Sequence, residues 1–196
     1  MAESSGFTRR HFLTVATFVT GGAGAIATAW PFVASFRPSA KAQALGAPVT
    51  VDISKLELGA LLRVEWRGRV IYVLHRTQEM LASLTKDVAL LDDPNSEEDQ
   101  QPSYAKNEHR SIRPEVLVVE GVCTHFGCAP APRFEVAPAD LGPEWPGGFF
   151  CPCHGSKFDL AGRVFAGVPA PTNLLVPPHR YINDSTILIG SDTGSS

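Results

Sequence analysis

The stretch Cys151-Pro152-Cys153-His154-Gly155-Ser156 decides the fold, because Cys123-Thr124-His125-Phe126-Gly127-Cys128 repeats its chemistry upstream. Together the two stretches hold all four cysteines of the chain, and each holds one histidine. A Cys-x-His pair in one and a Cys-x-x-His pair in the other supply two thiolates and two imidazoles. This ligand set predicts a metal centre between two loops that the fold must bring together.

The mixed ligand set is typical of a Rieske [2Fe–2S] centre, in which one iron binds two cysteines and the other binds two histidines. Each loop has one cysteine left over, within three residues of a ligand. A disulfide between these two, Cys128 and Cys153, would clamp the loops together. The expected ligands are Cys123 and Cys151 on one iron and His125 and His154 on the other.

Two other interpretations use the same residues. A Cys2His2 zinc site has the same ligand atoms, but zinc sites commonly place both cysteines in one element and both histidines in another. Here each loop is mixed, and two cysteines would be left over. Two structural disulfides with incidental histidines leave both histidine spacings unexplained. The iron–sulfur centre accounts for all six residues.

The N-terminal stretch Thr8-Arg9-Arg10-His11-Phe12-Leu13 resembles the twin-arginine signal, an address for the export of folded proteins. From Phe12 to Phe36 there is no charged residue. As a helix this run measures about 37 Å, which spans about 30 Å of hydrocarbon with tilt. Ala40-Lys41-Ala42 resembles a cleavage site, but the apolar core of a cleaved signal is usually about 7–15 residues long. The longer run favours a retained anchor.

Length and composition fit one compact domain with an appendage. The chain has 196 residues, 44% of them hydrophobic and 19% charged, and a net charge of −3. We expect no nucleic-acid partner, because no long basic stretch is present. We divide the chain into a cytoplasmic export segment at residues 1–11, a transmembrane helix at 12–36, a flexible tether at 37–48 and a head domain at 49–196.

The tether from Pro38 to Pro48 is rich in small residues and almost featureless. It lacks the apolar periodicity that would dock it on a core, which indicates a helix-poor linker. On the residues alone, a functional tether and a plain spacer both remain open.

After Pro48 the pattern becomes that of β-structure, with short runs rich in β-branched and aromatic residues. Arg67-Gly68 is expected to form a tight hairpin, and Thr77 to cap one or two helical turns that end at Leu84. The polar segment 87–108 contains a group of acidic residues. It is either an acidic docking patch or a solvated surface insertion. Strands are expected at Val49–Ile53, Leu61–Trp66, Val70–Leu74, Pro114–Glu120, Ser156–Asp159, Arg163–Phe165 and Thr186–Ile189.

The twin-arginine start, the anchor, the linker, both cysteine–histidine loops and the proline-rich loop Gly167–Pro171 together resemble the Rieske iron–sulfur subunit of bacterial cytochrome bc1 complexes (ubiquinol–cytochrome c reductase). The resemblance covers nearly the whole chain. It implies a mainly β fold: a Rieske-type antiparallel β-sandwich head with a small cluster-binding subdomain at about residues 120–171, tethered to one N-terminal transmembrane helix. It also implies one [2Fe–2S] cluster on Cys123, His125, Cys151 and His154, and a Cys128–Cys153 disulfide.

The same resemblance implies a function. A subunit of this kind accepts an electron from ubiquinol, with a proton passing to a cluster histidine, and hands the electron to cytochrome c1. His154 is the stronger candidate for quinol contact and proton acceptance, and His125 is the second. The implied partners are cytochrome b and cytochrome c1 in a dimeric bc1 complex, an oxidoreductase and translocase of a respiratory or photosynthetic chain. The chain would cross the inner membrane once, with its head on the periplasmic side and able to swing on its tether.

An alternative function is that of an electron-transfer subunit in another exported oxidoreductase, such as arsenite oxidase. That class usually lacks a long anchor and tether, whereas this chain has an uncharged run from Phe12 to Phe36.

Supporting roles are expected for the residues that flank the ligands. Phe126 would line the quinol contact surface, or only screen the cluster from water. Gly127 and Gly155 fit places where the backbone bends tightly or approaches the cluster closely. The Ser156 hydroxyl is placed to donate to a bridging sulfide, although serine also suits a plain turn. Phe158 stands where mitochondrial members carry a tyrosine, and it has no donor to offer.

The segment Gly167-Val168-Pro169-Ala170-Pro171 resembles the proline loop that shields the cluster in this family. Pro169 would belong to that shield. Val168 interrupts the Gly-Pro-Ala-Pro form found in other members, and a plain surface turn is the alternative interpretation.

Overall fold

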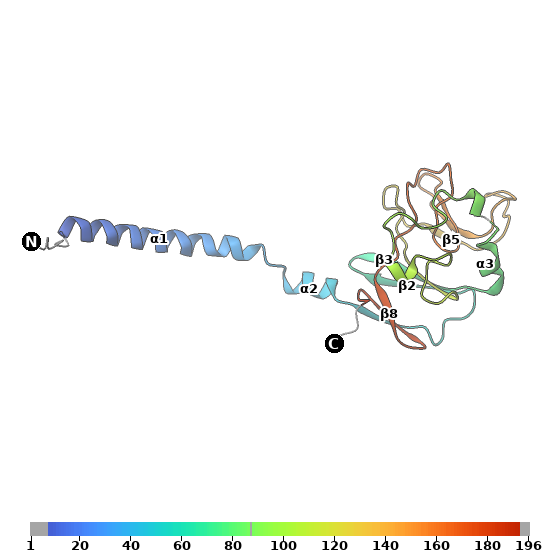
Figure 1. Ribbon diagram of the computed structural model, residues 1–196, viewed down its shortest axis with the longest axis horizontal. Coiled ribbons are helices and arrows are strands. Elements are labelled where there is room, and N and C mark those ends of the chain that lie inside the picture. Colours follow the sequence, from blue (N-terminus) through green and yellow to red (C-terminus); the bar gives the residue numbers. More distant parts are fainter. Residues whose placement is uncertain (1–7, 87, 193–196) are drawn as a thin grey trace, which may run out of the picture. The chain divides into compact units, whose positions relative to one another are not determined.

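The computed structural model describes residues 8–86 and 88–192 and divides into two compact units, Met1–Ala44 and Leu45–Ser196 (Figure 1). Residues 1–7 of the predicted export segment and the last four residues of the predicted head lie outside the described residues. The first unit contains the N-terminal helix. The second contains all of the β-strands and both cysteine–histidine loops.

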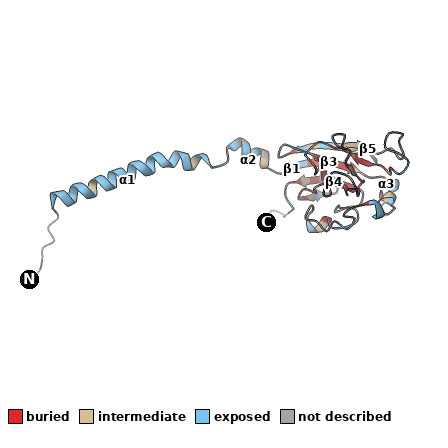
Figure 2. Cartoon of the chain, turned by 90° about the horizontal axis from the view of Figure 1, so that it is seen from above, coloured by how far each residue is buried: buried red, intermediate tan, exposed pale blue. Residues whose placement is uncertain are grey.

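Helix α1 (Arg9–Ser35) coincides with most of the predicted membrane helix. Thr8 caps it by accepting a hydrogen bond from the His11 amide at 3.4 Å. Nearly all of its residues are coloured as exposed (Figure 2), and by length and composition it can cross a membrane. The hydroxyls of four threonines donate to carbonyls four residues earlier, as a lipid environment requires of polar groups. These threonines are Thr14, Thr17, Thr20 and Thr28.

The linker is not helix-poor as expected, because residues Ala40–Gly46 form a short helix, α2. Ser39 precedes it and accepts a hydrogen bond from the Ala42 amide through its hydroxyl at 3.1 Å. Alanine is the strongest helix former and serine a preferred N-cap, so the local sequence favours a helix without an apolar face. The missing periodicity excluded docking on a core but said nothing against a helix.

The described residues of the head form three sheets of three antiparallel strands each. The first runs in the order β1-β9-β8, from Val49–Asp52, Thr186–Ile189 and His179–Asn183. The second runs β2-β3-β4, from Leu61–Trp66, Arg69–His75 and Val116–Glu120. The third runs β5-β6-β7, from Ala131–Arg133, Gly148–Phe150 and Lys157–Phe158.

Strands β3 and β4 are buried on both faces, which places the second sheet in the middle of the head. Alternate residues such as Ile71 and Val73 pack in a cluster with Val51 of β1 and Ile187 of β9. That cluster is the core of the predicted antiparallel sandwich. The intervening residues of the two strands, Tyr72, Leu74, Leu117 and Val119, pack in a second cluster with Phe149, Phe158 and Leu160. The third sheet therefore covers the outer face of the sandwich.

The short connections follow their local sequence. Arg67 and Gly68 join β2 to β3 with φ of 53° and 71°, so both residues of the predicted hairpin turn are left-handed. Helix α3 (Gln78–Ser83) forms where expected, and the Thr77 hydroxyl accepts a hydrogen bond from the Met80 amide at 3.3 Å. Two 3-10 helices, η1 (Val88–Leu90) and η2 (Ser103–Ala105), lie in the acidic segment.

The strand expected at Arg163–Phe165 does not form. Only isolated bridges occur there, from Val164 to Phe158 and from Phe165 to Leu91. Phe165 instead joins Leu91 and Trp145 in a third apolar cluster. Phe165 is apolar because it packs against the loops that contain Leu91 and Trp145. The β-branched and aromatic residues of this segment therefore do not indicate a strand.

The acidic segment 87–108 is more than a solvated insertion. Leu91 and Ser96 are buried, and Ala105 is completely enclosed. The carbonyl of Asp93 accepts a hydrogen bond from the side-chain amide of Asn173 at 3.0 Å. Its acidic side chains Asp92, Glu97, Glu98 and Asp99 remain exposed, while its backbone and apolar residues pack against the part of the head that follows the second loop.

Candidate metal centre

The two cysteine–histidine loops have the same internal hydrogen bonds. In loop 1, residues 123–128, the Gly127 amide donates to the Cys123 carbonyl at 2.9 Å, and the Cys123 amide donates to the Cys128 carbonyl at 2.8 Å. In loop 2, residues 151–156, the Gly155 amide donates to the Cys151 carbonyl at 3.0 Å, and the Cys151 amide donates to the Ser156 carbonyl at 2.8 Å. Each loop is thus a compact turn, entered directly from β6 in the case of loop 2.

The two loop glycines are required by backbone conformation. Gly127 has a φ of 82° and Gly155 a φ of 79°, in the left-handed region that favours glycine. A Cβ built on either would meet no described atom within 4 Å. The sequence offered two reasons for these glycines, a tight bend of the backbone and a close approach to the cluster. The positive φ angles and the open space around both glycines support the tight bend.

The loops are joined covalently by a disulfide between Cys128 and Cys153, with an S–S distance of 2.09 Å. This confirms the pairing implied by the sequence resemblance. Cys123 and Cys151 remain free, and each is only 2% exposed. The sulfur atoms of Cys128, Cys151 and Cys153 also lie within 4.8 Å of one another. That trio is not a ligand set, because two of its sulfurs are bonded to each other.

The two histidines meet at the outer end of the loops. The rings of His125 and His154 lie edge to face, with centroids 4.8 Å apart. His154 is exposed and His125 half-buried. The Nδ1 atom of His125 is buried and has no hydrogen-bond partner among the described residues. A buried ring nitrogen without a partner is costly unless it binds a metal, so this atom fits the predicted ligand role.

The free thiols also fit a metal centre. Burial raises the pKa of the Cys151 thiol, opposed by the Cys153 amide and reinforced by the neighbouring Cys123 thiol. The Cys151 thiol therefore resists becoming a thiolate by itself. A bound cation offsets this penalty, because it stabilises the thiolate form directly.

An exposed aromatic side chain completes the tip. Phe126 is 78% exposed, and its ring centroid lies 4.0 Å from that of His125 and 6.0 Å from that of His154. Phe126 therefore contacts both histidines while presenting most of its apolar surface outward. The tip is a small patch of two imidazoles and one phenyl ring.

Behind the tip, the proline loop is tied to both cysteine–histidine loops. The Ala170 amide donates to the Ser156 hydroxyl at 3.0 Å, and the Thr124 hydroxyl donates to the Thr172 carbonyl at 2.7 Å. Ser156 is completely buried, whereas Pro169 is exposed. The sequence did not single out Thr124, although a hydroxyl between two predicted ligands was a signal that could have found it.

Val168 and Phe158 have packing roles. Val168 is half-buried and packs against both the second and the third apolar clusters, so side-chain contacts hold the proline loop at this position. Phe158 in β7 is fully buried and packs in the second apolar cluster. Gly148 has to be glycine, because a Cβ there would lie 2.1 Å from the Phe158 carbonyl oxygen.

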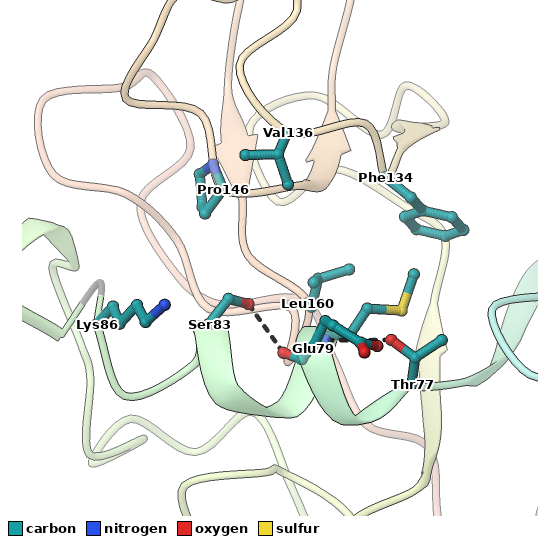
Figure 3. Close-up of a pocket in the computed structure, with 9 residues that line it drawn as sticks. Thr77, Glu79, Ser83, Lys86, Phe134, Val136, Pro146 and Leu160 are labelled. Carbon is teal, nitrogen blue, oxygen red and sulfur yellow. Dashed lines mark hydrogen bonds between the residues drawn. The ribbon is translucent and has the colours of Figure 1, made fainter.

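A cavity of about 390 Å³ lies elsewhere in the head, between α3 and the segment that contains Phe134 and Pro146 (Figure 3). Its lining includes apolar residues such as Met80 and Leu160 together with the charged residues Lys86 and Glu79. No predicted ligand lines it. The metal centre is thus a surface tip, and the cavity belongs to a different part of the molecule.

Comparison with known proteins decides the family. Residues 72–178 match the Rieske [2Fe-2S] domain, and residues 1–39 match the ubiquitinol-cytochrome C reductase Fe-S subunit TAT signal. The ubiquinol-cytochrome c reductase iron-sulfur subunit of Allochromatium vinosum is 61% identical over 188 residues, which cover 96% of this chain and 91% of that protein. The chain belongs to the Rieske subunit family.

Two further Rieske subunits of the same name match over almost their full length. That of Blastochloris viridis is 43% identical over 196 residues, covering 97% of each chain. That of Bradyrhizobium diazoefficiens is 42% identical over 184 residues, covering 93% of this chain and 94% of the relative. None of these matches supports the alternative of an arsenite oxidase subunit.

Membership in the Rieske subunit family settles the cofactor, which is a [2Fe–2S] cluster. The free cysteines, the paired histidines and the partnerless Nδ1 of His125 fit it. It also gives the exposed apolar helix α1 a role, that of a single-pass membrane anchor.

Proposed function

We propose that this chain accepts an electron from ubiquinol and passes it to cytochrome c1 within a dimeric cytochrome bc1 complex, with cytochrome b and cytochrome c1 as its partners. The observation that carries the proposal is that two free, buried cysteines lie in the same two loops whose histidine rings meet at an exposed tip. Relatives named as ubiquinol-cytochrome c reductase subunits support the choice of electron donor and complex. In this assignment the chain is one subunit of an oxidoreductase and translocase.

We assign Cys123 and Cys151 to one iron and His125 and His154 to the other. The burial of both thiols and the partnerless His125 Nδ1 support this division. The cluster supplies a one-electron acceptor, and neutral imidazole ligands raise its reduction potential relative to an all-cysteine cluster. The disulfide and the loop hydrogen bonds hold the four side chains in place.

The histidines handle the proton. An imidazole that binds a metal through one nitrogen keeps the other nitrogen free for a proton. His154 is exposed and can meet a substrate directly, whereas the half-buried His125 is the second candidate. Phe126 offers an apolar surface beside both rings, which suits the ring of a quinol. His154 and Phe126 thus combine proton acceptance with apolar contact.

The head lies on the periplasmic side of the inner membrane in this proposal. The match of residues 1–39 to a twin-arginine signal supports export of the head, and the disulfide suits an oxidising compartment. Protease treatment of intact spheroplasts tests the orientation. Digestion of the head there is expected, and protection until the cells are lysed would refute the periplasmic placement.

The ligand assignment is tested with full-length His154→Gln and His125→Gln in membranes. We expect both to lose the electron paramagnetic resonance signal of a mixed-ligand cluster and the quinol-dependent reduction of cytochrome c. The matched control is His109→Gln, at a histidine whose contact with Glu108 lies outside both loops. Retention of the signal in His154→Gln would show that this residue is not a ligand.

A further inference from the structure

Three arginines are enclosed inside the head, and we name Arg76, Arg110 and Arg163 the arginine cluster. Their exposed fractions are 0%, 0% and 2%. They come from three separate places: the end of β3, the segment before β4 and the turn after β7. Arginine is almost never fully buried unless paired, so three such residues require an explanation.

All three side chains converge on one turn, residues 159–163. Arg76 donates through Nη1 to the Leu160 carbonyl at 3.1 Å. Arg110 donates through Nη1 to the carbonyls of Ala161 and Gly162, at 3.2 Å each. Arg163 donates through Nε to Asp159 Oδ2 at 2.7 Å.

The positive charge of the arginine cluster is only partly neutralised. Asp159, 1% exposed, is the fully buried carboxylate that contacts it. Asp93 is half-buried and Glu115 is exposed, so solvent screens both of these more distant carboxylates. Among the fully buried groups, three cations face one anion, which leaves an excess of two positive charges.

The remaining partners of the arginines are neutral. Arg76 also donates to the carbonyls of His109 and Pro114 and to the Ser111 hydroxyl. Arg110 also donates to the Leu174 carbonyl and the Gln101 side chain, and its Nε is buried with no partner in the described part of the chain. Burial lowers the pKa of Arg76 and Arg110 to about 10, so both stay protonated at neutral pH.

The arginine cluster lies close to loop 2. The turn that it grips begins at Asp159, three residues after Ser156, and the strand β7 connects the two. At about 3.3 Å per residue, roughly 10 Å of extended chain separates Ser156 from Asp159. Little water intervenes, because Phe158 and Leu160 are buried as well. Charges at this separation in a protein interior are screened far less than at the surface.

We propose that the arginine cluster raises the reduction potential of the metal centre by its charge. Reduction adds one negative charge at the loops, and a buried excess of positive charge stabilises the reduced state more than the oxidised state. The three arginines are then positioning residues with an electrostatic role, in addition to joining the turn to the rest of the head. This inference rests on the ligand set proposed above.

The test compares Arg110→Gln, which removes the charge, with the matched control Arg110→Lys, which keeps it. Midpoint potentials are measured by redox titration of the full-length proteins in membranes, and thermal unfolding is followed in parallel. Arg110→Gln should reduce the reduction equilibrium constant by up to roughly tenfold, which is what Coulomb's law gives for two unit charges about 12 Å apart at an effective dielectric constant near 20. Tenfold corresponds to about 59 mV for one electron. Arg110→Lys should change the constant less than about twofold, even where it lowers the unfolding temperature.

Equal potentials in Arg110→Gln and the parent, or equal falls in both variants, would overturn the proposal. Asp93→Asn provides a second readout if Arg110→Gln binds no cluster, because it removes a half-buried negative charge near Arg110 and should raise the potential. An unchanged or lower potential in Asp93→Asn would also count against it. Failure of the ligand set is distinguishable, since the parent itself would then lack the mixed-ligand spectrum.

Discussion

Replacing Ser156 by alanine removes one hydroxyl from loop 2 and leaves every proposed ligand in place. Ser156 is completely buried, and its oxygen accepts a hydrogen bond from the Ala170 amide at 3.0 Å. Its single proton has no acceptor among the described residues. We therefore expect that proton to be donated to a sulfur of the bound cluster, which becomes a better acceptor as negative charge is added.

The size of the effect on the potential follows from the hydrogen bond that the hydroxyl donates, and the effect on stability follows from the one that it accepts. A bond to a charged group contributes about 1.5–3 kcal/mol, of which about 1 kcal/mol would distinguish the reduced from the oxidised state. Since about 1.4 kcal/mol corresponds to 59 mV for one electron, Ser156→Ala should lower the midpoint potential by about 40 mV. The variant also leaves the Ala170 amide without its acceptor, which should cost about 1–3 kcal/mol of folding free energy.

Protein-film voltammetry measures the potential, and calorimetry measures the unfolding temperature. The matched control is Ser83→Ala, which removes a hydroxyl that donates to the Met80 carbonyl at 2.8 Å on α3, outside the metal centre. The control should leave the potential unchanged. A midpoint potential of Ser156→Ala equal to or above that of the parent would refute the reasoning. If only the unfolding temperature falls, the role of Ser156 is to hold the proline loop through the Ala170 amide.

Four other substitutions test separate parts of the structure. Cys128→Ser should keep the ligands but loosen the loops, so cluster retention and unfolding temperature fall; unchanged values of both would deny the disulfide a clamping role. Gly155→Ala should destabilise the head by about 1–3 kcal/mol because of its positive φ, measured by denaturant unfolding, and a neutral result would contradict the strain argument. Replacing residues 42–44 by three prolines should break α2 and slow turnover without altering the cluster spectrum, whereas normal turnover would leave this segment as a spacer. Phe158→Tyr should raise the potential by tens of millivolts if its ring edge points toward the cluster, and a potential at or below that of the parent would exclude that orientation.

Residue types and spacings were enough to predict the cofactor, while the assignment of its ligands stays a prediction. The mixed Cys-x-His and Cys-x-x-His pairs predicted two meeting loops, and the structure brings His125 and His154 to a centroid distance of 4.8 Å. The disulfide followed from the sequence resemblance and is present. A metal site can be predicted from sequence because few residue types can bind iron, so a cysteine or histidine at the right spacing is a specific signal.

Other elements depend on contacts that are distant in sequence, and these were missed. Strand β5 (Ala131–Arg133) contains a proline and is only three residues long, so its pairing with β6 leaves little local signal. Strand β8 was likewise not recognised, although it pairs with β9 with one irregularity between Tyr181 and Asn183. The arginine cluster is the extreme case, because nothing local distinguishes Arg110 from an exposed arginine; only the carbonyls at 161, 162 and 174 make it a core residue.

Protein contacts contribute to holding the arrangement of the two cysteine–histidine loops. Hydrogen bonds within each loop fix its turn, the disulfide joins loop 1 to loop 2, and Ser156 and Thr124 tie both loops to the proline loop. The side chains proposed as ligands are therefore held in the protein framework, which lowers the entropy that binding must overcome. A framework held this way also resists movement of the ligands when the cluster gains or loses an electron. Rigid ligands keep the structural change on electron transfer small, which suits a carrier that must both accept and release its electron quickly.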